Sequence, residues 1–324
     1  MTEKLTIRSI NESHEESNLV PYAQLSKNTR GRLHPENDCD IRTAYQRDRD
    51  RIIHSEYFRK LKGKTQVFIL KYEFFRSRLT HTLEVSQIAR TIARALRLNE
   101  DLVEAIALGH DLGHTCFGHS GEEVLNQLTG HFIHNEQSLR VVEILEREGK
   151  GLNLTKEVRD GILHHRGEGT PMTMEGKLVK IADRITYLCH DIQDSLTAGI
   201  LTRNEIPERF CQILGESHSQ RVNTFVTDMI AETSRQLEAG NEIRIYQSKK
   251  IEEIMLELRS FMFQNVYNGP MCMREKEKAA HIVEFLYRSC LDRMSSRQAV
   301  DLIAGYTDNV AIREFQDQII PSPK

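Results

Sequence analysis

The chain has 324 residues, of which 39% are hydrophobic and 28% are charged, and its formal net charge is −3 at pH 7. This composition is ordinary for a globular protein with a substantial core, so it argues against a disordered chain. Because the net charge is small, nothing at the level of the whole chain requires nucleic acid or a membrane as a partner.

Cysteine usage and hydropathy indicate a cytoplasmic protein. The six cysteines include no Cys-x-x-Cys pair, and in a chain of this size they indicate free thiols in a reducing compartment. The first residues lack the apolar stretch of a signal peptide, and no apolar run approaches the roughly 18 residues that a membrane span needs. We therefore expect no membrane segment.

The first part of the chain carries few helix signals. Residues 1–40 are polar, contain Pro21 and Pro35, and include the basic run 27–32, which together predict an irregular N-terminal arm. From residue 43 apolar residues recur at helical spacing, and basic residues between 47 and 64 crowd the other face. We expect most of these charges to be solvated, although some could reach a polyanionic ligand.

The segment 65–70 is a short apolar run rich in β-forming residues. It predicts one short strand, with at most a small β-hairpin near residues 64–76. Beyond it, the absence of proline between Pro35 and Pro171 permits a long succession of helices. Apolar residues at spacings of three and four predict helices over 80–96, 100–110, 121–128, 135–148, 156–164 and 174–197.

The sequence therefore predicts an all-α fold whose catalytic core spans residues 41–205. Residues 206–324 form a second region of amphipathic helices with many exposed charges and no cluster of catalytic side chains. We expect this region to pack on the core and to be available for assembly. Its helices are predicted over 207–214, 222–238, 248–266, 275–293 and 296–304.

The densest group of reactive side chains lies between Gly109 and Glu122. It contains His110, Asp111, His114, His119 and Glu122, and two further histidines, His131 and His134, follow closely. An adjacent His-Asp pair supplies an imidazole and a carboxylate to a divalent metal, and the glycines of the segment permit a tight turn around the site. The stretch therefore predicts a hydrolytic metal centre.

Two more candidate ligands lie far away in the sequence. His81 stands near the start of the helix predicted over 80–96, and Asp183 stands one step from the apolar stripe of the helix over 174–197. A carboxylate so close to a core face needs a partner, which a metal would provide. A single histidine or aspartate is more often a structural residue, so the prediction rests on the set.

In this order and on helices, the set resembles the HD superfamily of metal-dependent phosphohydrolases. The flanking sequence is similar to the deoxyguanosine-triphosphate triphosphohydrolase family from about residue 28 to residue 315. The segments that carry this resemblance, in the order of the family, are 45–55, 58–68, 78–85, 110–122, 134–140, 182–188 and 301–308. One departure is Thr115-Cys116, where family members commonly have proline or small residues. This departure leaves the candidate metal ligands unchanged. We expect Cys116 to act as a small packing residue.

The resemblance implies cleavage of a deoxynucleoside triphosphate at the α-phosphorus, with release of deoxynucleoside and inorganic triphosphate. By matched position, the metal ligands would be His81, His110, Asp111 and Asp183. His119 and Glu122 would form a catalytic pair, since residues three apart share a helical face. His114 and His134 would contact the phosphates or support His119.

The resemblance also implies which residues bind the substrate. Tyr187 would pack under the deoxyribose, where a 2′-hydroxyl would clash, and Asp191 with Gln66 would bind the 3′-hydroxyl. Plausible contacts with the triphosphate are Arg59, Arg78, Lys180 and Arg184, of which Arg78 matches the family best.

Cofactor and partners follow from the same resemblance. Two histidines and two carboxylates suit one Mn²⁺, Fe²⁺, Ni²⁺ or Zn²⁺ ion per site, and Mg²⁺ less well. The family implies a homo-oligomer, and a second deoxynucleotide could act as an allosteric effector. Weak, salt-sensitive binding of single-stranded nucleic acid would be compatible with catalysis.

Two other functions fit the same residues. The first is another HD phosphohydrolase, such as a nucleotidase or a phosphodiesterase, which would release orthophosphate or a monophosphate. The second is a non-catalytic HD scaffold that binds nucleic acid through the basic segments 27–32 and 47–64. The pair His119 and Glu122 argues against a scaffold, which has no need of it.

Overall fold

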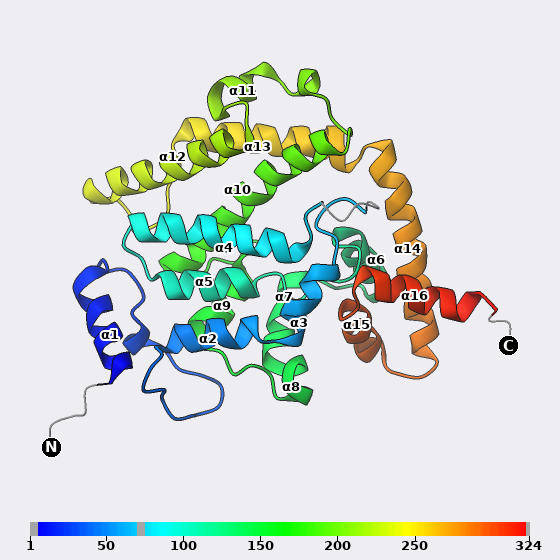
Figure 1. The fold of residues 1–324 in the computed structure, drawn as a ribbon, viewed down its shortest axis with the longest axis horizontal. Coiled ribbons are helices and arrows are strands. Elements are labelled where there is room, and N and C mark those ends of the chain that lie inside the picture. Colours follow the sequence, from blue (N-terminus) through cyan, green and yellow to red (C-terminus); the bar gives the residue numbers. More distant parts are fainter. Residues whose placement is uncertain (1–5, 70–74, 322–324) are drawn as a thin grey trace.

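A computed structural model of the protein describes residues 6–69 and 75–321. The described residues form helices and no sheet, so the predicted all-α fold is confirmed (Figure 1). Where a small hairpin was predicted, they contain a single antiparallel bridge, between Thr65 and Ser77. Residues 70–74 of that prediction lie outside the described residues.

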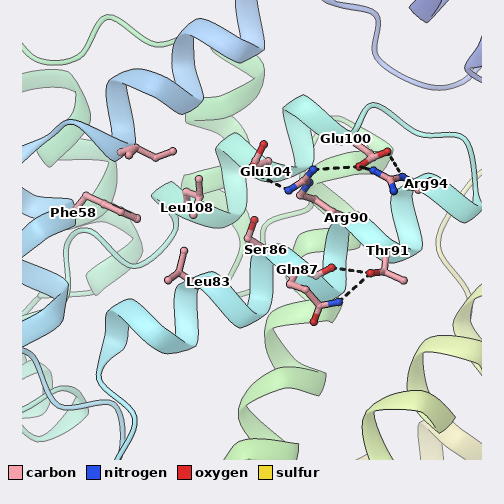
Figure 2. A pocket seen from close by; sticks show the side chains of 11 residues that line it. Phe58, Leu83, Ser86, Gln87, Arg90, Thr91, Arg94, Glu100, Glu104 and Leu108 are labelled. Atoms are coloured by element: carbon pink, nitrogen blue, oxygen red, sulfur yellow. Dashed lines mark hydrogen bonds and ion pairs between the residues drawn. The ribbon is translucent and has the colours of Figure 1, made fainter. Parts of the chain in front are cut away.

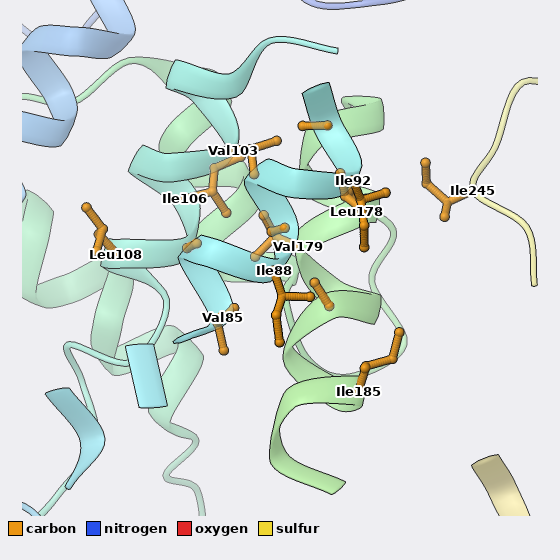
Figure 3. Packing of buried hydrophobic residues seen from close by; sticks show 14 of the residues in the cluster. Val85, Ile88, Ile92, Val103, Ile106, Leu108, Leu178, Val179, Ile185 and Ile245 are labelled. Carbon is orange, nitrogen blue, oxygen red and sulfur yellow. The ribbon is translucent and has the colours of Figure 1, made fainter. Parts of the chain in front are cut away.

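Three helices form the centre of the molecule. Helix α4 (Arg78–Ala95) packs against α5 (Glu100–Gly109), and α10 (Met174–Thr197) contacts both of them. Figure 3 shows how aliphatic side chains such as Ile88, Ile106 and Val179 interlock between them. Helices α2 (Ala44–Ile53) and α9 (Lys156–His164) flank α5. All these helices were predicted from apolar spacing, because each buries one stripe in this core.

The starts of the central helices follow from their capping residues. Asn99 precedes α5 and accepts a hydrogen bond from the amide of Leu102, and Thr173 precedes α10 and accepts one from Gly176. Such caps satisfy backbone N–H groups that have no partner inside a helix. They fix the residues at which α5 and α10 begin. The positions of the polar residues along the axes of these two helices follow from this.

The remaining helices build two layers around this centre (Figure 1). Helices α12 (His218–Glu238) and α13 (Lys249–Met262) pack on α10, and α11 (Glu208–Leu214) covers both. A second, smaller core joins α6 (His119–Thr129) to the last three helices, which are α14 (Pro270–Leu291), α15 (Ser296–Ala304) and α16 (Asp308–Ile319). The segment 116–119 therefore lies where the two cores meet.

One connection after α6 is irregular. Helix α7 (His134–Arg140) continues through a π-helical turn, Val141–Leu145, into the short α8 (Glu146–Gly149). Helix α3 (Glu56–Lys60) lies between α2 and the segment that leads to α4. The helix predicted over 135–148 is thus broken near its C-terminal end.

The arm predicted to be irregular contains helix α1 (Ile7–Asn18), so that prediction was wrong for these residues. The helix begins with a capping box of Thr6 and Ser9. Ile7 and Ile10 are its only apolar residues and both are exposed, so no apolar stripe marks this helix in the sequence. The described part of the chain contains no helix long and apolar enough to cross a membrane.

The basic face predicted over residues 47–64 is largely paired. Arg47 and Arg51 both contact Glu36, at 3.1 and 2.7 Å. Lys64 is buried and donates to backbone carbonyl groups, so its assignment to a solvated face was wrong. These pairs reduce the positive charge that the segment could offer to nucleic acid.

A groove of about 430 Å³ runs along the outer side of α4 and α5 (Figure 2). Its apolar part includes Phe58 and Leu83. Two arginines lie at its polar end, but Arg90 contacts Glu104 at 3.1 Å and Arg94 contacts Glu100 at 2.7 Å. None of the predicted site residues lines this groove.

Candidate metal centre and active site

The four predicted metal ligands meet at the centre of the bundle. His81 comes from α4, His110 and Asp111 directly follow α5, and Asp183 comes from α10. His81 Nε2 is 3.0 Å from Asp183 Oδ1, and His110 Nε2 is 3.7 Å from the same oxygen. The donor atoms of His81, His110 and Asp111 lie within 4.8 Å of one another. This arrangement could hold one metal ion.

His110 is oriented as a metal-ligating histidine is. Its Nδ1 lies 2.6 Å from the carbonyl oxygen of Ala107, which can only accept a hydrogen bond, so the ring proton belongs on Nδ1. Nε2 then carries a lone pair, is buried, and has no hydrogen-bond partner. A buried lone pair beside two carboxylates fits a divalent cation.

The carboxylates of this centre are held in their charged form. Burial raises the pKa of Asp111, but His110 and Arg78 bring it well below the usual range. For Asp183 desolvation acts in the same direction, and the hydrogen bond with His81 lowers the pKa again. Ionised carboxylates are the form that binds a metal.

Arg78 lies inside the site rather than on its rim. Its side chain is buried, Nη1 is 2.8 Å from Asp111 Oδ2, and Nη2 donates to the carbonyl oxygen of Gln66 at 3.3 Å. The residue predicted as the firmest triphosphate contact therefore holds a predicted metal ligand in this structure. Its Nε has no hydrogen-bond partner.

The predicted catalytic residues form a second cluster. His119 Nδ1 lies 2.9 Å from Glu122 Oε2, and His134 Nδ1 lies 2.9 Å from Glu122 Oε1. Burial raises the pKa of Glu122, but the two imidazoles lower it far below the usual range. The side chain of His119 is 59% exposed, whereas that of His134 is 3% exposed. His119 is therefore accessible to a ligand and Glu122 orients its ring.

His114 joins the two clusters. Its Nε2 is 3.3 Å from Asp111 Oδ1, and its ring stacks on that of His134 with centroids 3.7 Å apart. Burial and the charge of Arg78 hold the pKa of His114 well below its usual range. A neutral ring at this position can pack between the metal ligands and the catalytic pair without adding charge.

Sequence reasoning missed two residues of this region. His165 Nε2 lies 3.2 Å from His134 Nε2, and Arg166 Nη1 lies 3.2 Å from Glu122 Oε2. Burial and the neighbouring histidines lower the pKa of His165 to about 3. The run His164-His165-Arg166, at the end of the helix predicted over 156–164, was the available signal.

Two of the three predicted sugar-binding residues, Tyr187 and Asp191, lie on α10. Asp191 is buried and accepts a hydrogen bond from the hydroxyl of Tyr267, which the sequence did not predict. Tyr187 is partly buried, four residues before Asp191 on α10. Gln66 is 8% exposed and its Oε1 has no hydrogen-bond partner, so this oxygen could accept a hydrogen bond from a ligand.

Replacing Asp191 with asparagine is expected to flatten the dependence of stability on pH. Burial raises the pKa of Asp191 from 3.8 to about 8, so between these values the folded chain keeps a proton that the unfolded chain releases. Stability therefore falls as the pH rises through this window. The free energy of unfolding, measured with urea at pH 5, 6, 7 and 8, should change less steeply with pH in Asp191→Asn. The expected difference in this pH dependence is on the order of 1 kcal/mol per pH unit. Parallel curves would contradict this.

The other predicted phosphate contacts make local bonds. Arg59 is exposed and donates to the carbonyl oxygen of His54 at 3.0 Å. Lys180 donates to the carbonyl oxygens of Gly167 and Gly169, both at 2.7 Å. Arg184 is partly buried and follows the metal-ligand candidate Asp183. The structure thus gives Arg59 and Lys180 other partners, and among the described interactions Arg184 has no contact with the metal group.

The segment between the two clusters is tied to the C-terminal helices. Asp308 accepts hydrogen bonds from the amides of Phe117 and Thr65, at 2.8 and 2.9 Å. Lys64 donates to the carbonyl oxygens of His114 and of Ala304, and its burial lowers its pKa to about 7. Phe117 has a φ of +60°, which is costly for a residue with a side chain. We call these contacts the C-terminal clasp, because they hold the strained segment.

Gly113 lets the same segment pass close to α7. A Cβ atom there would lie 2.1 Å from the backbone nitrogen of Ser138 and 2.5 Å from the carbonyl oxygen of His134. The amide of Gly113 donates to Ser138 Oγ, and that hydroxyl donates to the carbonyl oxygen of His110. The side-chain hydroxyl of Ser138 therefore links the backbone of Gly113 and of His110 to α7.

Replacing Gly113 with alanine should destabilise the protein by about 3 kcal/mol or more. The new methyl group meets backbone, which yields less easily than a flexible side chain, so the cost lies at the upper end for overpacking. The loss in the free energy of unfolding is measured by urea denaturation. Gly130→Ala is the control, because a Cβ there meets no atom within 4 Å and only the φ of +79° is strained, at a cost of about 1 kcal/mol. Equal losses in the two variants would contradict the packing argument.

Comparison with known proteins agrees with this geometry. Residues 78–188 match the HD domain family, and residues 245–296 match the phosphohydrolase-associated domain. Over 336 residues the chain is 50% identical to a deoxyguanosinetriphosphate triphosphohydrolase-like protein of Caldanaerobacter subterraneus subsp. tengcongensis, covering 98% of this chain and 97% of the relative. A protein of Desulfatibacillum aliphaticivorans with the same description is 45% identical, with coverages of 98% and 99%.

A solved structure shares the fold. A hypothetical protein from Aquifex aeolicus superimposes with a TM-score of 0.51 at 21% identity, over 84% of this chain and 71% of that one. The helical bundle, its histidine and aspartate groups and the matched domains define an HD-domain phosphohydrolase. Within that class, the chain belongs to the deoxyguanosinetriphosphate triphosphohydrolase-like family.

Proposed function

We propose that the protein hydrolyses deoxynucleoside triphosphates, dGTP or other dNTPs, to deoxynucleoside and inorganic triphosphate. The observation that carries this proposal is the junction of the two clusters at Asp111, whose Oδ1 lies 3.4 Å from His110 Nε2 and 3.3 Å from His114 Nε2. A candidate metal site and a histidine–carboxylate pair therefore adjoin one another. The family resemblance over nearly the whole chain supports the choice of substrate.

The site residues would have separate roles in metal binding and in proton transfer. His81, His110, Asp111 and Asp183 would hold one divalent cation, which supplies Lewis-acid polarisation of a phosphate oxygen when bound. In the overall reaction, water forms a bond to the α-phosphorus, the bond from this phosphorus to the 5′ oxygen breaks, and the water proton goes to the departing 5′ oxygen. His119 would take part in this proton transfer, while Glu122 fixes its ring.

The sugar contacts would select the substrate. Gln66 and Asp191 would bind the 3′-hydroxyl, and Tyr187 would pack where a ribonucleotide carries its 2′-hydroxyl. A buried acceptor left without a partner penalises a sugar that lacks the hydroxyl. Arg78 and Arg184 would add positive charge for the triphosphate. An effector site and a homo-oligomer remain predictions.

Product analysis tests the proposed reaction. The protein is incubated with dGTP and Mn²⁺, and the products are separated by anion exchange. We expect deoxyguanosine and tripolyphosphate in equal amounts. Release of orthophosphate, pyrophosphate or a monophosphate without tripolyphosphate would contradict the proposal and favour another HD phosphohydrolase. GTP differs from dGTP only by its 2′-hydroxyl and is therefore the matched control substrate. We expect it to be hydrolysed more slowly than dGTP.

A further inference from the structure

One carboxylate at the start of α16 joins two segments that lead into the candidate active site. Asp308 Oδ1 accepts a hydrogen bond from the amide of Phe117 at 2.8 Å, and Asp308 Oδ2 accepts one from the amide of Thr65 at 2.9 Å. The hydroxyl of Thr65 also donates to Oδ2. Both oxygens of this side chain are therefore used on segments that lie far from α16 in the sequence.

Asp308 is not the residue that caps its own helix. Thr307 precedes α16 and accepts a hydrogen bond from the amide of Val310, which satisfies a backbone N–H group at the start of the helix. Asp308 is the first residue of α16, and all the described hydrogen bonds of its side chain go to Thr65 and Phe117. The carboxylate thus serves the site rather than the helix that carries it.

The segment bound through Phe117 leads directly to His119. Only Gly118 stands between the two residues. Phe117 has a φ of +60° and Gly118 has a φ of +57°, and the first of these is costly for a residue with a side chain. Two consecutive residues in this region of φ turn the chain sharply into α6, whose first residue is His119. An anchor outside the segment is therefore needed to hold this conformation.

The segment bound through Thr65 is the surface against which this turn packs. A Cβ atom on Gly118 would lie 2.9 Å from the carbonyl oxygen of Thr65 and 3.0 Å from Arg78 Nη2. Arg78 Nη2 in turn donates to the carbonyl oxygen of Gln66 at 3.3 Å. The two segments therefore meet backbone against backbone beside a buried arginine of the site. By binding both amides, Asp308 presses one segment on the other and sets where α6 begins.

We propose that Asp308 is a positioning residue for hydrolysis, which holds His119 in place through Phe117 without touching the substrate. This role rests on the proposed function, because it presupposes that His119 takes part in proton transfer. Misplacement of a reacting group by about 1 Å can cost on the order of 100-fold in rate, even when the altered residue lies far from the chemistry. The C-terminal helices thereby contribute to the reaction through one carboxylate.

Asp308→Asn tests the proposal with little change in shape. An asparagine keeps one acceptor oxygen but turns an NH₂ group toward the second amide, so one of the two segments loses its anchor. We expect kcat for dGTP to fall about 10-fold to 100-fold, with the metal content unchanged by elemental analysis. Asp301→Asn is the matched control in α15. Its carboxylate binds Gln137 and Arg140 of α7, at 3.0 and 2.7 Å, so we expect kcat to stay close to that of the unmodified protein.

A double-mutant cycle with His119→Ala separates positioning from general damage. If Asp308 acts through His119, Asp308→Asn lowers kcat in the unmodified protein and has little further effect in the His119→Ala protein, because interacting residues are not additive. An equal loss in both backgrounds would overturn the proposal. Equal losses in Asp308→Asn and Asp301→Asn would overturn it as well.

The ring of His119 gives a readout that needs no nucleotide. In protein with isotope-labelled histidine, the ring signal of His119 is the nuclear magnetic resonance signal lost in His119→Ala. We expect Asp308→Asn to shift or broaden this signal and Asp301→Asn to leave it in place. An unmoved signal in Asp308→Asn would overturn the positioning role even if dGTP yields triphosphate. If the unmodified protein releases no triphosphate, the proposed function fails, and the ring signal still decides whether Asp308 positions His119.

Thr65→Val replaces Asp308→Asn if that variant fails to fold. It removes only the hydroxyl that donates to Asp308 and keeps both backbone hydrogen bonds. We expect kcat to fall by roughly fivefold, the factor that one hydrogen bond supplies, and the loss to disappear in the His119→Ala background. An unchanged kcat in Thr65→Val would then overturn the proposal.

Discussion

Replacing Asp183 with alanine is expected to remove metal binding and hydrolysis together. Asp183 Oδ1 lies 3.0 Å from His81 Nε2 and 3.7 Å from His110 Nε2, so this carboxylate connects the two imidazoles of the predicted metal site. Loss of a residue that only supports a ligand already costs about 10-fold to 100-fold. Loss of a ligand should therefore lower kcat/KM by more than about 100-fold. Metal content and dGTP hydrolysis are measured on the same sample.

Asp194→Ala provides the control for this variant. Asp194 lies further along α10 and forms an ion pair with Arg76, so its loss removes a carboxylate from the same helix without touching the predicted ligands. We expect metal content and activity close to those of the unmodified protein. Full metal content and full activity in Asp183→Ala would refute the ligand assignment.

Replacing His119 with alanine is expected to lower kcat by about 10² to 10⁴-fold while the metal stays bound. The ring of His119 is exposed, and its Nδ1 is held by Glu122 at 2.9 Å, as expected of a group that transfers protons to or from a bound substrate. His119 is not among the four predicted metal ligands, His81, His110, Asp111 and Asp183. Single-turnover hydrolysis of dGTP and elemental analysis of the same preparation separate chemistry from metal loss.

His131 is a matched control for His119. It is also an exposed histidine, and its Nε2 lies 2.8 Å from Glu136 Oε2, but it has no contact with the metal group or with Glu122 among the described interactions. His131→Ala should therefore leave kcat unchanged. An unchanged rate in His119→Ala, or an equal loss in both variants, would remove His119 from the proposed mechanism.

Much of the fold could be predicted because most helices bury an apolar stripe. The predicted helices over 156–164, 174–197 and 296–304 agree with α9, α10 and α15 at both ends. Two helices were missed, α1 and α16, for different reasons. Ile7 and Ile10 are the only apolar residues of α1 and both are exposed, so it carries no periodic apolar pattern. In α16, Ala311, Phe315 and Ile319 recur at a spacing of four, so the sequence held a signal that the prediction did not use.

The site was harder to predict than the helices. The run from His110 to Glu122 is contiguous and could be recognised, but the contact of Asp191 with Tyr267 spans 76 residues and that of Phe117 with Asp308 spans 191. Such pairs depend on how helices cross, which periodicity does not determine. His165 was missed because the run His164-His165-Arg166 does not show which of its residues belongs to the site, and only the structure shows the ring nitrogen of His165 facing that of His134.

The C-terminal clasp also bears on the order in which the protein can become active during synthesis. The hydrogen bond from the amide of Phe117 cannot form until Asp308 has been synthesised, 191 residues later. The bond from Lys64 to the carbonyl oxygen of Ala304 needs 240 further residues. Until then, the strained segment that leads to His119 lacks its anchors. A nascent chain that already carries His81, His110, Asp111 and Asp183 would therefore still lack a fixed proton-transfer group. The clasp would delay hydrolysis of cellular nucleotides until α15 and α16 have been made.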